Sequence, residues 1–517
     1  MDFPHPSASN DAWRSLCNVV EHSGIFDSEK RQPHSRCMDN TRVALRESIR
    51  EVLDRHDRTN VWLNGLAGVG KTSIAFTVAE EMKRVGRLAA TFFFSHKHAQ
   101  GAGRIIPTIA YQLALTFPRI RGDITKAIEQ DEVLLSSEKS RIDQMRELVI
   151  KPLHVLRFRQ ETPYAIIIDA LDECFSTEEA ARLVALFTET LSGPDLPTIH
   201  LVFTSRPEAH IRTAMSADVR HISLTTRDAD IVQDVRYFLR ASLDNIRTSH
   251  SAVFGWPPMP WPSENEFETL AFMAGGLFVY AAMVINFLSP VGHHPQQRLD
   301  LLLRERSNAS ADIDQLYRQI LATSENPRLH CRMLASVINL VQPLPLRDLQ
   351  ELFHADRESL AVMLEAFSPV ILNSPDGSGN VEIYHASLHD FMADRHRSEQ
   401  YHVDAAEAHE YLACRCLDLV VQTEPPYGGA LRYARYWWGT HLSKAYPSRE
   451  IRQRLAWFKR DNLRRLVTVA EQDQSLRDLI VNLREARKAC FSWVTILNIG
   501  RRCTLIKCRL EMDQKFI

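Results

Sequence analysis

The sequence lacks several patterns that would restrict its architecture or its location. Its nine cysteines form no C-x-x-C pair, and the neighbouring Cys414 and Cys416 have no matching His/Cys set, so we expect no structural zinc site. Residues 1–15 contain no basic segment followed by an apolar one, which argues against a secretory signal. No unit of 20–50 residues is repeated. We therefore expect a cytoplasmic protein with reduced thiols that is not a repeat solenoid.

Net charge is also small, but it is unevenly distributed. The 517 residues carry a formal net charge of -2, and 24% of them are charged, as in an ordinary globular protein. Residues 449–517 contain 16 Lys and Arg against 8 Asp and Glu, so a basic tail follows an acidic body. Because these basic residues are scattered, the tail is better explained as a solvated helical face, or as a segment that packs onto the acidic part of the same chain, than as a nucleic-acid-binding region. We expect no nucleic-acid partner.

One stretch without formal charge, residues 269–297, raises the question of a membrane span. Its apolar part, residues 270–288, is nearly long enough to cross a bilayer. Against a span are the adjacent Gly275 and Gly276, the polar Asn286, and flanks without clustered Lys or Arg. A helix buried on all sides of a helical domain has the same composition. We expect such a helix over 270–288 and no stable membrane span.

The sequence does contain one complete phosphate-binding motif, G-x-x-x-x-G-K-[ST], with a predicted strand before it (60–64) and a predicted helix after it (73–84). Glycines in such a turn let backbone N–H groups surround phosphate oxygens at a helix N-terminus. Lys71 would reach the β- and γ-phosphates, and Thr72 would place its hydroxyl on Mg²⁺. The pattern favours nucleoside triphosphate binding over a glycine-rich turn that binds nothing. The predicted binding residues are Gly65, Leu66, Ala67, Gly68, Val69, Gly70, Lys71, Thr72 and Ser73.

Further apolar runs alternate with helical segments and predict an α/β class with a parallel, doubly wound sheet that binds the nucleotide at its carboxyl edge. One run ends at Asp169, whose carboxylate would hold Mg²⁺ in the manner of a Walker B strand. Another run, 199–204, is followed by Arg206. This arginine either binds and so senses the γ-phosphate, or is a surface arginine in a turn. The helix over 105–117 is expected to have Pro107 in its first turn. The predicted strands are 60–64, 88–95, 165–169, 199–204 and 219–224.

Beyond the sheet region the periodicity is mainly helical, with a Pro/Trp loop at 254–262. Two short helices (344–353 and 359–366) and two strands across a turn (369–373 and 381–384) predict a winged-helix arrangement. We thus predict these parts: a polar segment 1–36, an NTPase domain 37–226, a helical domain 227–330, a winged helix 331–400, and a helical C-terminal region with the basic tail 401–517.

Together these motifs resemble the NACHT class of signal-transducing P-loop NTPases, most closely the fungal proteins whose module is similar to the nephrocystin-3 N-terminal NTPase region. The resemblance covers about residues 37–444 and rests on GLAGVGKTS, IIIDALDEC, FTSRPE, GGLFVYAA, YHASLHDFMADRHRS and LRYARYWWGTHL. It implies an ATP- or GTP-operated switch in which the NTPase domain, the helical domain and the winged helix close over the nucleotide. It also implies homo-oligomerisation or protein partners on activation.

The resemblance also implies roles for single residues. Asp172 would orient or activate the attacking water with the support of Glu173, and Arg206 would be the sensor arginine. Arg42 would contribute to nucleotide binding. His385 would contact the bound diphosphate from the winged helix, unless it is a histidine satisfied within that domain.

The sequence departs from the family pattern in two places. Phe278 stands where a proline usually follows Gly-Leu in relatives, here Gly276-Leu277. Neither the effector domain that usually precedes the module nor the WD repeats that usually follow it are recognisable.

Three functions compete at this point. A slow regulatory NTPase is favoured by the Asp169, Asp172 and Arg206 set. A nucleotide-stabilised scaffold without turnover is favoured by the missing effector domains. A small-molecule kinase shares the phosphate loop, but residues 226–448 supply no visible acceptor pocket.

Overall fold

The computed structural model divides into two compact units, and each is described here by itself. The first unit comprises Met1–Ile285 and Leu303–Ala311, and the second comprises Asn286–Leu302 and Asp312–Ile517. The residues that the structure describes are 6–29, 36–95, 101–156, 162–174, 176–215, 219–250, 261–289, 294–304, 313–353, 357–372, 379–420, 428–455 and 480–488. Most of the predicted basic tail therefore lies outside the described residues.

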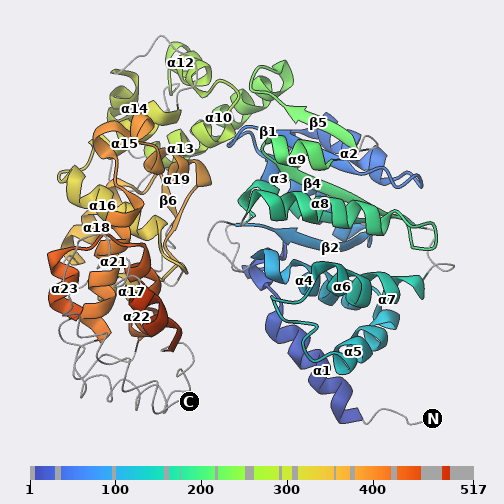
Figure 1. Cartoon of the computed structure of the whole chain (residues 1–517). Helices are drawn as coiled ribbons and strands as arrows, with labels where there is room; N and C mark the ends of the chain where they lie inside the picture. The colour runs from blue at the N-terminus through green and yellow to red at the C-terminus, as the bar shows by residue number, and fades with distance from the viewer. Residues whose placement is uncertain are drawn as a thin grey trace. The chain divides into compact units, whose positions relative to one another are not determined.

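A five-stranded parallel sheet with the order β2-β3-β4-β1-β5 forms the centre of the first unit (Figure 1). Strands β1, β2 and β4 are buried along their whole length, as expected when helices cover both faces of a parallel sheet. The predicted α/β class and all five predicted strands are confirmed. The strands are β1 (Val61–Gly65), β2 (Leu88–Phe93), β3 (Tyr164–Asp169), β4 (Ile199–Ser205) and β5 (Arg220–Leu224).

This strand order brings three separate chain segments to one edge of the sheet. Strand β4 pairs with β1 on one side and with β3 on the other, and all three run in the same direction. The phosphate loop after β1, the acidic segment after β3 and the Ser205-Arg206 segment at the end of β4 therefore meet at the carboxyl edge. The helices of this part are α2 (Val43–Leu53), α3 (Lys71–Arg84), α4 (Gly101–Thr116), α8 (Thr177–Leu191) and α9 (Ala209–Ala214).

Helix α4 begins earlier than the sequence predicts. It starts at Gly101, so Pro107 lies inside the helix, and the prediction that it occupies the first turn is wrong. A proline in a helix lacks an N–H and crowds the carbonyl four residues before it. That residue is Gly103.

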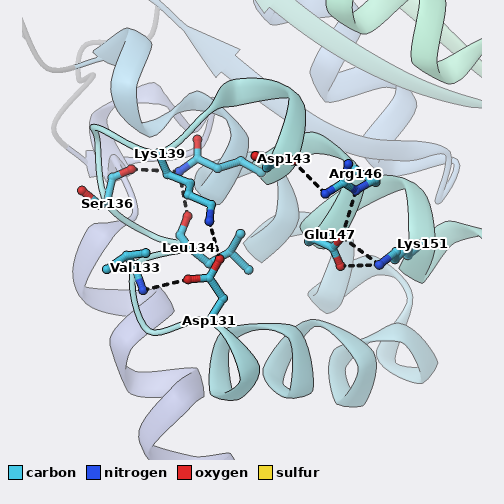
Figure 2. A network of polar contacts seen from close by, with 10 residues as sticks. Asp131, Val133, Leu134, Ser136, Lys139, Asp143, Arg146, Glu147 and Lys151 are labelled. Carbon is cyan, nitrogen blue, oxygen red and sulfur yellow. Dashed lines mark hydrogen bonds and ion pairs between the residues drawn. The ribbon is translucent and has the colours of Figure 1, made fainter.

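A helical subdomain packs on α4: its elements from η3 to α7 connect α4 to β3, and α1 lies against α4 and α5 (Figure 1). Its loop is held by polar contacts (Figure 2): Asp131 accepts hydrogen bonds from the Val133 N–H (3.1 Å) and the Lys139 ammonium (2.5 Å). The buried Gln144 amide donates to the Leu134 and Ser136 carbonyls at 2.9 and 3.1 Å. The elements are α1 (Pro6–Val19), η3 (Pro118–Ile120), α5 (Arg121–Gln130), α6 (Arg141–Met145), the π-helical turn η4 (Arg146–Ile150) and α7 (Lys151–His154).

The expected single helix over 270–288 is wrong, because the chain forms two helices there. Helix α12 (Glu264–Ala274) and helix α13 (Phe278–Leu288) are separated by Gly275 and Gly276, whose φ angles are 48° and 82°. These left-handed angles end a helix at little cost only for glycine. At Gly276 a Cβ would also lie 2.4 Å from the Thr226 carbonyl oxygen. No helix within the described ranges is long and apolar enough to cross a membrane.

The described residues of the second unit are mostly helical and include one two-stranded antiparallel sheet. The two short helices and two strands predicted from the sequence are present as α17 (Leu346–Leu352), α18 (Arg357–Ala366), β6 (Ile371–Leu372) and β7 (Glu382–Ile383). Most of the predicted turn between the strands lies outside the described residues, and the winged-helix interpretation stays a prediction. The remaining helices include α15 (Ile313–Ala322), α16 (Pro327–Ile338), α19 (Ala386–Ala393), α20 (Arg395–Ser398), α21 (Ala405–Val420), α22 (Gly429–Lys444) and α23 (Arg449–Leu455).

Helices α21 and α22 bury a chain of polar side chains between them. The Val341 N–H donates to Tyr433 Oη (3.0 Å), which lies 2.7 Å from His441 Nε2, and His441 Nδ1 lies 2.9 Å from His409 Nδ1. Burial lowers the pKa of His409 to about 4 and that of His441 well below its usual value, so both rings are neutral. Tyr433, His441 and His409 thus form one continuous buried hydrogen-bonded chain that begins at the Val341 N–H.

A short helical segment, residues 480–488, packs onto α22 through Asn482. The buried Asn482 amide donates to the carbonyls of Arg435 and Tyr436 at 3.0 and 2.7 Å, and its side-chain oxygen accepts from the Gly439 N–H at 2.8 Å. Gly439 permits this approach, because a Cβ there would lie 2.3 Å from the Asn482 backbone oxygen.

Candidate nucleotide-binding site

The phosphate loop connects the end of β1 to the start of α3. Gly65 is the last residue of β1 and Lys71 is the first residue of α3. Gly68 and Gly70 have φ angles of 82° and 94°, in the region that favours glycine. Gly68 and Gly70 thus allow the tight turn between β1 and α3 that an anion site built from backbone amides requires.

Lys71 lies across its own loop. Its ammonium donates to the carbonyls of Gly65 (2.8 Å) and Leu66 (2.9 Å), which uses two of its three N–H donors. Burial lowers the pKa of Lys71, and the neighbouring charges of Asp172 and Asp169 oppose this shift. The Lys71 ammonium is therefore close enough to both carboxylates for their charges to act on it, and a phosphate would complete its hydrogen bonding.

Asp169, the last residue of β3, is buried and held by a residue that the sequence reasoning missed. Thr204 on β4 donates its hydroxyl proton to Asp169 Oδ1 and accepts a hydrogen bond from the Ala170 N–H at 3.0 Å. Ala170 takes a left-handed conformation (φ 57°), which turns the chain away from the strand. Thr204 could have been found from its place at the end of a predicted strand next to Ser205 and Arg206.

Asp172 and Arg206 form an ion pair. The Arg206 backbone N–H donates to Asp172 Oδ1 at 3.0 Å, and Arg206 Nε forms an ion pair with Oδ2, also at 3.0 Å. Arg206 is fixed in turn by Ser205, whose hydroxyl donates to the Arg206 carbonyl (2.8 Å) and accepts from Trp62 Nε1 (2.8 Å). Asp172 belongs to the short helix η5 (Leu171–Glu173). The predicted water-orienting acid and the predicted sensor arginine are thus one ion pair here.

The structure brings most of the predicted site residues to one place. Asp172, Asp169, Arg206 and Glu173 all act electrostatically on Lys71. Thr72 is the second residue of α3, directly after Lys71. The catalytic roles of Asp172, Glu173 and Arg206 remain predictions.

Arg42 reaches the phosphate loop from its carbonyl side. Only 4% of its side chain is exposed, and its Nη2 donates to the Val69 carbonyl at 2.7 Å. Its backbone N–H donates to Asp234 Oδ2 at 3.0 Å, and its guanidinium carbon lies 5.0 Å from the centre of the Phe278 ring. Burial lowers the pKa of Arg42, and the Asp234 charge opposes this. The Arg42 contacts are thus with the loop backbone and with residues beyond the sheet.

His385 belongs to the second unit, where it caps α19. Its Nδ1 accepts from the Ser387 N–H (3.1 Å) and lies 2.7 Å from Ser387 Oγ, which contacts the Tyr317 hydroxyl at 2.8 Å. These contacts fix the ring at a helix N-terminus. The predicted contact of His385 with a diphosphate stays a prediction.

The residues present fit a Mg²⁺ ion that is shared with a nucleotide. Within the described residues, no group of three or more His, Cys, Asp or Glu side chains could hold a metal by itself. Mg²⁺ in phosphate-transfer sites is typically held by one or two protein oxygens together with phosphate oxygens and water. Thr72 Oγ and the Asp169 carboxylate are such hard oxygen ligands.

The parallel sheet, the GKT loop between β1 and α3, and the acid at the end of β3 define a P-loop NTPase fold. Residues 42–206 match the family model described as "Nephrocystin 3, N-terminal", which covers the sheet region as far as Arg206. No curated protein sequence matched the chain.

Several solved structures are similar at low sequence identity. A Walker-type ATPase of Pyrococcus abyssi is 14% identical over 70% of this chain and 97% of its own, with a TM-score of 0.35. Cdc6p of Pyrobaculum aerophilum is 14% identical over 75% and 98%, with a TM-score of 0.33. The Orc1 protein of Aeropyrum pernix, solved in complex with DNA, is 13% identical over 72% and 94%, with a TM-score of 0.30. At these TM-scores the similarities add nothing to the argument from the sheet and its loop.

Proposed function

We propose that the chain is a nucleotide-operated regulatory switch of the NACHT type. It binds ATP or GTP with Mg²⁺, hydrolyses it slowly, and thereby changes its self-association or its binding to protein partners. The observation that carries this proposal is the grouping of Lys71, Asp169, Asp172 and Arg206 at the carboxyl edge of the sheet beside a complete phosphate loop. Nucleic acid is not among the proposed partners.

In this proposal each group has one task. The amides of the loop and the Lys71 ammonium bind the phosphates, and Thr72 and Asp169 hold Mg²⁺, which neutralises phosphate charge. The γ-phosphate attracts Arg206 away from Asp172, and the freed Asp172 carboxylate, supported by Glu173, orients the attacking water. His385 donates to the diphosphate and favours the closed state.

A second candidate, a nucleotide-stabilised scaffold without turnover, is supported by one observation. Both Asp172 carboxylate oxygens are engaged by Arg206, so the predicted base is already neutralised by an ion pair. If the nucleotide does not separate this pair, Asp172 is not available as a base for water. Single-turnover hydrolysis by the purified chain separates the two candidates.

Nucleotide affinity of Lys71→Ala tests the shared part of both candidates. Loss of a charge-assisted hydrogen bond should weaken ATP binding by about 10- to 150-fold, corresponding to about 1.5–3 kcal/mol. Lys83→Ala is the matched control, since Lys83 lies at the far end of the same helix and pairs with Asp27 at 3.5 Å. An affinity for the Lys71 variant within twofold of wild type would reject the nucleotide site.

The predicted contact of His385 with the diphosphate has its own test. His385→Ala should weaken ADP binding more than ATP binding and shift the chain toward an open or self-associated form, because only differential affinity moves a two-state equilibrium. An ADP/ATP affinity ratio and a sedimentation profile equal to those of wild type would leave His385 as the structural cap of α19.

A further inference from the structure

Two consecutive carbonyls of the phosphate loop are held by groups outside the loop. The Gly68 carbonyl accepts from the Val279 N–H at 3.2 Å, and the Val69 carbonyl accepts from Arg42 Nη2 at 2.7 Å. Val279 lies in the first turn of α13, and Arg42 directly precedes α2. Neither residue belongs to the G-x-x-x-x-G-K-[ST] motif.

Holding a carbonyl also orients the next amide. In a trans peptide unit the C=O and the following N–H point in opposite directions. The hydrogen bond from Arg42 to the Val69 carbonyl therefore turns the Gly70 N–H away from Arg42. The hydrogen bond from Val279 to the Gly68 carbonyl likewise turns the Val69 N–H away from α13. Since a phosphate loop binds anions through such successive N–H groups, these contacts orient the binding amides in advance.

Arg42 is itself fixed by the helices that follow the sheet region. Its N–H donates to Asp234, which lies on α10 (Ala229–Ser249), and the same carboxylate lies 3.9 Å from Arg42 Nε. The guanidinium lies over the ring of Phe278, the first residue of α13, and Phe278 packs against Phe238 of α10. The φ angle of Arg42, 57°, is left-handed and costs free energy that these contacts offset. The phenylalanine that replaces the usual proline is therefore part of this arrangement.

We propose that Arg42 is a positioning residue, which orients the Val69–Gly70 peptide for phosphate and links the loop to α10 through Asp234 and to α13 through Phe278. It acts through the loop backbone and does not itself contact the base. This inference rests on the proposed nucleotide site. It predicts that Arg42 matters for any ligand that fills the phosphate loop, including one without base or sugar.

The test compares ATP with inorganic tripolyphosphate, both with Mg²⁺, on the full chain. Arg42→Gln keeps part of the aliphatic stem, but it removes the charge and is too short to donate to the Val69 carbonyl. It should therefore weaken binding of both ligands by about tenfold. Arg42→Lys restores a donor and should recover part of the loss for both. Arg46→Gln is the matched control, because Arg46 lies in the first turn of α2, which Arg42 directly precedes, and pairs with Glu81 on α3 at 2.5 Å.

Each outcome decides the inference. Weaker ATP binding with unchanged tripolyphosphate binding would make Arg42 a base or ribose ligand and overturn the positioning role, and so would unchanged binding of both ligands. Lys71→Ala is measured in parallel: if its affinity is unchanged, the nucleotide site itself fails, whereas a loss there without a loss in Arg42→Gln rejects only the role of Arg42.

Asp234→Asn tests the link to α10 and remains informative if Arg42→Gln does not fold. It keeps an acceptor for the Arg42 N–H but removes the charge beside the guanidinium, so it should weaken binding of both ligands by about threefold. In combination with Arg42→Gln or Arg42→Lys its effect should be less than additive, because both changes act on one contact. Full additivity would overturn the link between α10 and the loop.

Discussion

The carboxyl edge of the sheet and the interface between α21 and α22 use buried polar groups in opposite ways. At the sheet edge the groups are charged, and Lys71, Asp169, Asp172 and Arg206 act on one another electrostatically. Between α21 and α22 the groups are neutral, and each hydrogen bond of the Tyr433–His441–His409 chain ends on another member or on Val341. The first arrangement can exchange its internal partners for an anionic ligand, whereas the second has completed its hydrogen bonds internally. Changes at the first should affect ligand chemistry, and changes at the second should affect stability.

The largest expected effect is on hydrolysis. Asp172→Asn removes the carboxylate that would act on water and should slow single-turnover hydrolysis by about 10²–10⁴-fold while ATP binding stays close to wild type. Asp143→Asn is the control, since Asp143 is a more exposed carboxylate that also pairs with an arginine, Arg146 (Figure 2). An unchanged rate would assign the role to Glu173 or to no protein base.

The complementary test removes one residue of the buried Tyr433–His441–His409 hydrogen-bond chain. His441→Phe leaves the Tyr433 hydroxyl and His409 Nδ1 buried without their partner, which should lower the free energy of unfolding by about 2–4 kcal/mol. Affinity for ATP in the folded protein should stay unchanged. Denaturant unfolding measures the loss, with the exposed His396→Phe as control. Equal stability of the two variants would contradict the closed hydrogen-bond chain.

The pH dependence of stability sharpens the same contrast. The pKa of His409 is lowered to about 4 in the folded chain, against about 6.5 when unfolded, so acid favours the unfolded chain. The stability contributed by the neutral ring is complete above pH 6.5 and is lost as the pH falls through 4, in total about 3 kcal/mol. At pH 5 the loss should be about 2 kcal/mol. His409→Gln does not titrate and should show a smaller decrease between pH 7 and 5; equal slopes for both proteins would refute the assignment.

The smallest effect concerns Trp62, whose indole N–H donates to Ser205 at the end of β4. Trp62→Phe removes the donor to Ser205 Oγ and leaves part of the buried indole space empty, so it should cost about 1–2 kcal/mol of unfolding free energy. Because Ser205 also holds the Arg206 carbonyl, hydrolysis should slow slightly as well. Ser205→Ala should reproduce the change in rate. A normal rate in both variants would show that Arg206 needs no support from Ser205.

The elements that the sequence predicted and those that it missed differ in a physical way. Strands such as 165–169 were predictable because each is a short apolar run with a clear end, and the phosphate loop because its glycines and Lys71 have fixed spacing. The break at Gly275 and Gly276 was missed because one buried helix and two have the same apolar composition. Thr204, Asp234 and Phe278 were missed as site residues because their partners are distant in sequence: Asp234 meets Arg42 across 192 positions. Only the folded sheet and helices bring such groups together.

The contact of Asn482 with α22 has a practical consequence for protein production. A fragment that stops at residue 455, the end of α23, would keep every helix from α15 to α23 but would remove the amide that caps the Arg435 and Tyr436 carbonyls. It would also uncover the glycine face of α22 at Gly439, leaving buried backbone groups open to water and to other chains. Shortened versions of this protein should therefore extend at least through residue 488, and recombinant yield and aggregation of Asn482→Ala in such a fragment would report on this single asparagine.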